Sequence, residues 1–168
     1  MKIFSSPDKV ASKSGRKVAG MVHRYECVIS RRSTASPQAL YALIADGARW
    51  SQWAAPLIPY STWECLSPNG DEGVGAIRAV GRRKQPTREQ VTIHEPPHRH
   101  GYTLLSDGAI RDYQGEVTFV EDDGGTRVTW RGRYETRWRA VGLGYWLVLR
   151  VVLGTLTRKL VAGAERKG

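Results

Sequence analysis

Residues 125–135 read GTRVTWRGRYE, with arginine on alternate positions. Side chains of a β-strand point to opposite faces in turn, so this pattern predicts a strand with two different faces. We assign the arginine face to solvent. The other face carries two large rings, Trp130 and Tyr134, with Gly132 between them. A glycine beside two rings predicts a close backbone approach, a bend, or room for a bound molecule.

The preceding segment predicts the hairpin partner of this strand. Residues 122–125, DDGG, are a strong hairpin-turn signal. Residues 110–121, IRDYQGEVTFVE, again place a ring, Tyr113, next to a glycine, Gly115, on one face. Both strands therefore present an inner face of mostly apolar character with a few polar groups, as ligand pockets do.

The remaining elements predict an α+β fold. Five further strands are predicted at residues 24–34, 60–66, 74–81, 88–95 and 100–106. Residues 36–53 predict two short helices after the first strand; Ser36 is the N-cap of the first and Pro37 its first residue, and Pro56 stops the second. A long helix follows from about Arg139. Strands joined by short links predict an antiparallel sheet with its helices gathered on one face.

Length and charge divide the chain into two parts. The 168 residues suit one domain, and 40 % hydrophobic with 25 % charged residues is globular composition. We predict a basic flexible extension at residues 1–22 and a domain at residues 23–166. The formal charge is +10, and about half of the excess lies near the N-terminus. Contact of this extension with an anionic membrane surface is left open.

Several classes of partner and site are disfavoured by the sequence. Arginines and rings of residues 125–135 fall on opposite faces, so they cannot form one stacking groove, and nucleic-acid binding is not expected. Cys27 and Cys65 form no metal-type pattern. His94, His98 and His100 lie at a proline-bent turn, where we expect exposed imidazoles rather than a metal site. We predict no cofactor and no metal, and leave the oligomeric state open.

The termini and the helices give a prediction of location. The N-terminus lacks the apolar region of a signal peptide, and no run reaches the roughly 18 apolar residues of a membrane span. We therefore expect a soluble, cytoplasmic protein, and the arginine-rich composition is typical of a bacterial genome rich in G and C. The last helix is apolar nearly all round except for Arg150. Burial inside the molecule, dimerisation and lipid contact are all compatible with this pattern.

The ordered set of segments resembles the SRPBCC (START-like, helix-grip) superfamily, in particular its polyketide cyclase/dehydrase and lipid-transport branch. The resemblance rests on SPQALYALIADGARWSQW, GVGAIR, REQV, GYTL, IRDYQGEVTF and GTRVTWRGRYE, and covers about residues 24–165. It implies a curved, antiparallel, seven-stranded sheet that wraps around the long C-terminal helix and leaves an apolar cavity between them.

Alternation selects the polar residues of the inner face. On residues 88–95 the apolar pair Val91 and Ile93 predicts an inward face that includes Glu89. On residues 74–81 Arg78 shares a face with Ala76 and Val80, although the opposite set is equally plausible as the inner one. Arg78 and Glu89 then form either a ligand anchor, with Glu89 as a candidate base, or a fixed ion pair that stiffens the sheet.

These observations lead to a functional hypothesis with two alternatives. We expect a carrier or sensor that binds a small hydrophobic molecule, such as a lipid or polyketide. The alternatives are a polyketide cyclase or aromatase that uses the same cavity, and a basic surface adaptor for anionic lipid or nucleic acid. The catalytic residues of an enzyme are not fixed by the sequence; the candidates are Glu89, Arg78 and Tyr102. The predicted ligand-binding residues are Trp50, Trp53, Arg78, Glu89, Tyr102, Tyr113, Trp130 and Tyr134.

Overall fold

The computed structural model of the protein describes residues 21–106 and 108–166. The predicted basic extension therefore lies outside the described residues, except for Met21 and Val22. In chain order the elements are β1 (His23–Ser33), α1 (Pro37–Ala45), the 3-10 turn η1 (Gly47–Arg49), α2 (Trp50–Ala54), β2 (Tyr60–Cys65), β3 (Ile77–Arg82), β4 (Gln85–Glu95), β5 (Arg99–Leu104), β6 (Arg111–Asp122), β7 (Gly125–Thr136) and α3 (Arg139–Glu165).

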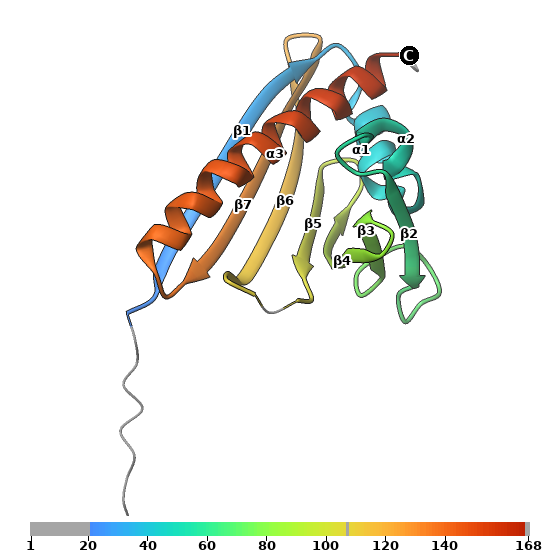
Figure 1. Ribbon diagram of the computed structural model, residues 1–168. Helices are drawn as coiled ribbons and strands as arrows, with labels where there is room; N and C mark the ends of the chain where they lie inside the picture. Colours follow the sequence, from blue (N-terminus) through green and yellow to red (C-terminus); the bar gives the residue numbers. More distant parts are fainter. Residues whose placement is uncertain (1–20, 107, 167–168) are drawn as a thin grey trace, which may run out of the picture.

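The seven strands form one antiparallel sheet with the order β1-β7-β6-β5-β4-β3-β2. The sheet curves, α3 crosses its concave side diagonally, and α1 and α2 lie near the C-terminal end of α3 (Figure 1). The prediction of an α+β, helix-grip architecture is confirmed. The first strand, β1, pairs with the last strand, β7. This pairing places the two ends of the sheet sequence side by side.

The first of the two short helices begins where the sequence predicts. The Ser36 hydroxyl accepts a hydrogen bond from the amide of Ala39 at 3.3 Å, and Pro37 is the first helical residue of α1. The buried residues of α1 include Leu40 and Ile44. Because these helices close one end of the sheet, their aromatic residues reach the concave face.

The inner face of β3 and β4 agrees with one prediction and corrects another. Arg78 is fully buried, and Glu89 and Val91 are buried too. The prediction that Ile93 faces inward is wrong. A register shift between Val91 and Ile93 turns the strand by one residue, so Ile93 pairs with Gly101 and packs on its outer side.

Helix α3 is held at both ends by β1 and its neighbours. Near its start the hydroxyl of Tyr134 donates to the carbonyl of Gly142 at 2.7 Å, and the hydroxyl of Tyr25 donates to the carbonyl of Arg139 at 3.0 Å. At its end Glu165 Oε1 accepts from the Ser33 hydroxyl at 3.0 Å. Four buried leucines pack its inner face, Leu149, Leu153, Leu156 and Leu160.

The same helix is long and apolar enough to cross a membrane by length and composition alone. Only 22 % of the apolar 18-residue stretch that meets this test is buried. A core helix passes the same test, and here the four leucines of the inner face pack against the protein. The apolar character of α3 is therefore only partly used by the fold.

Candidate functional site

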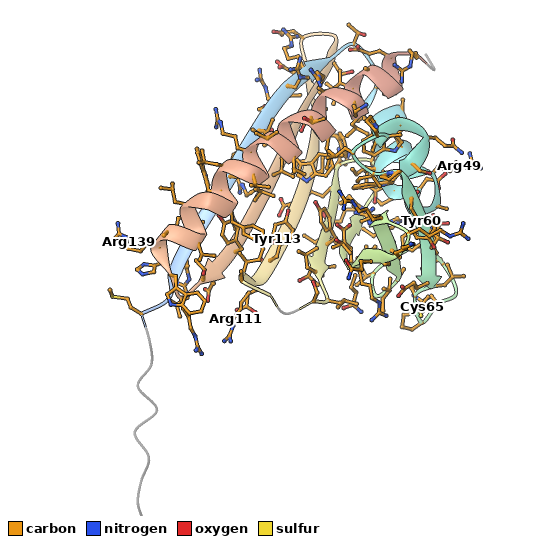
Figure 2. The ribbon with its side chains drawn as sticks, in the orientation of Figure 1. Arg49, Tyr60, Cys65, Arg111, Tyr113 and Arg139 are labelled. Carbon is orange, nitrogen blue, oxygen red and sulfur yellow. The ribbon has the colours of Figure 1, made fainter. Side chains whose placement is uncertain are left out.

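The concave face of the sheet carries a row of polar side chains that we call the polar cluster, defined as Arg78, Glu89, Tyr102 and Tyr113. Arg78 lies directly opposite Glu89 on the neighbouring strand. Tyr102 follows on β5 and Tyr113 on β6, with their ring centroids 6.1 Å apart. Tyr113 lies on the side of β6 that faces α3 (Figure 2). Four elements of the sheet thus bring together residues that are 35 positions apart in the sequence.

Arg78 is the fixed member of the polar cluster. Its guanidinium lies 3.9 Å from the ring centroid of Trp50 and 5.0 Å from that of Tyr102, close enough for cation–π attraction. Its Nη1 donates to the carbonyl of Ile44 at 3.3 Å, and the indole of Trp50 donates to the same carbonyl at 2.9 Å. The end of α1 and the start of α2 therefore clamp the arginine in place.

Glu89 is the member with an open hydrogen-bonding position. Its Oε2 accepts from Arg78 Nε at 2.8 Å. Its Oε1 accepts no hydrogen bond from the residues that the structure describes, and the side chain is 10 % exposed. Burial raises the pKa of Glu89, while the charge and hydrogen bond of Arg78 oppose that shift. Glu89 is thus a carboxyl group that holds a proton more readily than an exposed glutamate does.

The two tyrosines supply neutral hydroxyl groups. The indole of Trp130 donates to the Tyr102 hydroxyl at 3.2 Å, so the proton of that hydroxyl is still available to another acceptor. Burial raises the pKa of Tyr102 to about 12 and the pKa of Tyr113 well above its usual value. Both phenols therefore remain protonated at neutral pH and act as donors.

The gap predicted beside Gly132 is occupied by side chains. Gly115 and Gly132 lie opposite each other on β6 and β7. The ring of Tyr102 lies directly over Gly115. A Cβ on Gly132 would lie 2.9 Å from Leu149 Cδ2, a carbon on α3. The groups that approach Gly132 are side chains, of Leu149, Tyr113 and Leu153, rather than the backbone approach that the sequence suggested.

The predicted tryptophans form a buried group against the polar cluster. The ring centroid of Trp50 lies 5.1 Å from that of Trp53 and 5.9 Å from that of Trp130. Trp53 also lines a hollow of about 460 Å³ between α1, α2 and the end of α3. Tyr134 lies apart from this group, because it stacks on Tyr25 at 5.5 Å and uses its hydroxyl to hold α3.

His98 is exposed, as expected, and His94 is half-buried, but His100 contradicts the expectation of an exposed imidazole. His100 is fully buried, and neither ring nitrogen has a hydrogen-bond partner among the described residues. Burial, with Arg78 and His94 nearby, holds the pKa of His100 well below its usual range. The hydroxyl of Tyr41 lies 3.1 Å from His94 Nδ1. Within residues 21–106 and 108–166 no group of three or more potential ligands is placed to hold a metal ion.

Sequence reasoning missed Tyr41 and the burial of His100. A signal for His100 existed, since strand alternation puts it on the same face as Tyr102. Tyr41 carried no such signal, because its contact with His94 joins α1 to a strand 53 residues away.

The arginines of residues 125–135 lie on the outer face and are paired there. Arg133 Nε donates to Glu26 Oε1 at 2.8 Å, and Arg127 Nη2 donates to Asp122 Oδ2 at 2.6 Å. Arg131 Nε lies 3.3 Å from Glu26. Much of the positive charge on this face is therefore compensated by neighbouring carboxylates.

A sequence profile described as polyketide cyclase / dehydrase and lipid transport matches residues 26–167. No curated protein sequence matches the chain. The fold is similar to that of the protein XoxI from Bacillus cereus, with 15 % identity and a TM-score of 0.66 over 82 % of this chain and 94 % of that one.

Two further solved structures share the fold. One is the di-domain aromatase/cyclase BexL from the BE-7585A biosynthetic pathway, with 19 % identity and a TM-score of 0.63 over 85 % of this chain and 49 % of that one. The other is truncated norcoclaurine synthase from Thalictrum flavum, with 12 % identity and a TM-score of 0.66 over 83 % of this chain and 92 % of that one.

Proposed function

Because the chain belongs to the polyketide cyclase/dehydrase and lipid transport family, we propose that it binds a small hydrophobic molecule between the sheet and α3. The observation that supports this most directly is the open oxygen of Glu89, set beside two protonated tyrosines in a mainly apolar core. Binding sites for small molecules combine apolar walls with a few such polar groups.

The polar cluster indicates what kind of molecule would fit. A carbonyl or hydroxyl group on the ligand would meet the phenol protons of Tyr102 or Tyr113 and the carboxyl group of Glu89. A charged ligand group would gain less, since Arg78 is already paired with Glu89 and covered by Trp50. We therefore propose a mainly apolar ligand with at least one neutral oxygen, carried or sensed without chemical change.

Entry of the ligand requires side chains to move. Trp50, Arg78 and Trp130 have almost no accessible surface, whereas Glu89 and Tyr113 retain a little. We place the ligand against Glu89 and Tyr113, in the space gained when Leu149 and the ring of Tyr102 shift away from the paired glycines.

A second candidate function is a cyclase or aromatase that uses the same site. The raised pKa of Glu89 favours it, because a carboxyl group that titrates nearer to neutral pH exchanges protons with a ketone or enol more effectively. In that case Glu89 would move the proton, Tyr102 and Tyr113 would polarise a ketone oxygen, and Arg78 would hold Glu89 in position. Such proton transfer contributes about 10² to 10⁴-fold to a rate.

The experiment that tests binding is native mass spectrometry of the purified full-length protein, followed by competition with an apolar fluorophore. We expect a bound molecule or saturable fluorophore binding. Tyr113→Phe should weaken binding of an oxygen-bearing ligand by about tenfold, as loss of one buried hydrogen bond does. Tyr60→Phe, on β2 and outside the polar cluster, is the matched control and should leave affinity unchanged (Figure 2). Equal losses in both variants, or no saturable binding at all, would count against the proposed site.

Turnover separates the two functions. An enzyme converts a poly-β-ketone to a cyclised product, and Glu89→Gln should then keep binding but lose conversion. A carrier returns the same ligand unchanged in the wild type and in the variant. Extraction of the bound molecule after incubation, with its mass compared before and after, decides between them.

The cysteines support a location in a reducing compartment. Cys27 is buried, Cys65 is exposed, and both are free thiols. We propose that the protein acts in the cytoplasm of a bacterium, where thiols stay reduced.

A further inference from the structure

The first half of α3 presents an apolar face that points away from the sheet. Leu143, Leu147 and Val151 follow one another at four-residue spacing, and Val148 lies beside them. Their exposed fractions run from 56 to 69 %. Side chains this large and this exposed on one helix face mark an interaction surface rather than part of the core.

The apolar surface continues past the start of the helix. Trp138 precedes α3 and is also largely exposed, as are Met21 and Val22 just before β1. His23 pairs with Thr136, so these residues lie at the same end of the molecule, where β1 and α3 both begin (Figure 1). We call Leu143, Leu147, Val148, Val151 and Trp138 the α3 face.

The charged residues of the segment that carries the α3 face are all of one sign. Residues 137–164 contain five basic residues and no acidic one. Arg137 and Arg139 stand at the start of the helix, and neither makes an ion pair with a described residue. Arg139 and Arg111 lie toward this same end of the molecule in Figure 2. Arg150 lies 5.5 Å from the ring of Trp146, on the flank of the helix.

This charge distribution decides between two occupants. A second copy of the chain, docked by the same face, would bring two sets of unpaired arginines together without a carboxylate in the first half of α3 to compensate them, since the acidic residue of the helix, Glu165, lies at its far end. A bilayer with anionic headgroups offers an apolar layer for the leucines and valines, with negative charge just above it for the arginines. Tryptophan is favoured at that same boundary.

We infer that the α3 face docks on the surface of a bilayer that contains anionic phospholipid, with α3 parallel to the membrane plane. The helix does not need to leave the fold to do so, because Leu149 and Leu153 stay packed against the sheet. The inference is independent of the ligand proposed above.

The test uses the full-length protein and two kinds of vesicle, phosphatidylcholine alone and phosphatidylcholine mixed with phosphatidylserine. Co-sedimentation should show binding to the mixed vesicles that weakens as salt is added. The double replacement Leu147→Glu and Val151→Glu should lower the partition coefficient by at least about tenfold, because two apolar side chains no longer enter the bilayer. Val120→Glu, at an equally exposed valine on β6, is the matched control and should bind like the wild type.

Three outcomes would overturn the inference. The first is failure of the wild type to bind mixed vesicles at low salt, and the second is binding of the double variant as strong as that of the control. The third is a wild-type protein that binds no vesicles but forms a dimer in sedimentation equilibrium, while the double variant is a monomer. That result would assign the α3 face to a second copy. Since all substituted residues are exposed, circular dichroism should show the same fold for every variant.

Discussion

Arg78 and Glu89 are direct partners across β3 and β4, and Nε and Nη2 of the arginine both lie 2.8 Å from the same oxygen, Glu89 Oε2. One strand position away on β4, Arg88 forms a second pair with Glu64, on the outer face and in solvent. The two pairs have the same chemistry but differ in burial, so they separate the contribution of burial from that of charge.

Removal of one partner should lower the stability of the protein strongly for the buried pair and only slightly for the exposed pair. Glu89→Leu leaves the guanidinium of Arg78 buried without a counter-charge, and we expect the free energy of unfolding to fall by about 3–5 kcal/mol. Glu64→Leu exposes Arg88 to water and should cost at most about 1 kcal/mol. Urea denaturation measures both. Replacing both members, Arg78→Met with Glu89→Leu, should recover most of the loss, and equal losses for Glu89→Leu and Glu64→Leu would contradict the assignment of burial as the cause.

His100 should make stability depend on pH. Burial, Arg78 and His94 hold the pKa of His100 well below its usual range, and Tyr41 packs against the ring. The unfolded chain takes up a proton at this residue near pH 6.5, about its unperturbed pKa, whereas the folded chain does not. The stabilisation is thus complete above about pH 6.5 and declines on acidification, by up to about 1.4 kcal/mol for each pH unit.

The matched variants are His100→Leu and His98→Gln. His98 is exposed at the neighbouring turn, so its replacement should leave the pH dependence unchanged. His100→Leu should remove this component of the slope. It should also cost little at neutral pH, since neither ring nitrogen of His100 has a hydrogen-bond partner among the described residues. If unfolding free energies of His100→Leu and the wild type keep a constant difference from pH 7 to pH 5, the buried imidazole is not the cause.

The two thiols should react at different rates. Cys27 is 1 % exposed and burial raises the pKa of its thiol, whereas Cys65 is exposed near the end of β2 (Figure 2). The thiolate is the reactive form, so a thiol reagent should modify one cysteine quickly in the native protein and both in denaturant. Cys65→Ser should abolish the fast phase, and Cys27→Ser should leave it intact. Two fast equivalents in the native wild type would contradict the closed packing around Cys27.

Strand alternation identified much of the concave face without a structure. It placed Glu89 with Val91, and the structure puts both on the inner side, where Tyr102 lies too; His100 shares that side, although we expected its imidazole to be exposed. It failed at Ile93, because a β-bulge adds one residue to the strand and no residue in that stretch signals the bulge.

Contacts between elements that are distant in the chain could not be predicted from the sequence. The clamp on Arg78 uses the carbonyl of Ile44, a backbone atom with no side-chain signature, and the ring of Trp50, which was predicted only as a ligand-binding residue. Gly132 was recognised as unusual, but its neighbour Leu149 comes from α3. Which of several interpretations a glycine satisfies depends on the element that covers it.

Two glycines of α3 provide a last test, because they lie two positions apart and differ in surroundings. A methyl group on Gly142 would overlap the ring of Tyr25 and crowd Thr136, while nothing lies within 4 Å of the same position on Gly144. Gly142→Ala should therefore destabilise the protein by about 1–3 kcal/mol, as overpacking does. Gly144→Ala should stabilise it by up to about 1 kcal/mol, since alanine favours the helix. Thermal unfolding of the two variants measures the difference, and similar shifts in Tm would mean that α3 does not sit against β1 at its start as closely as described.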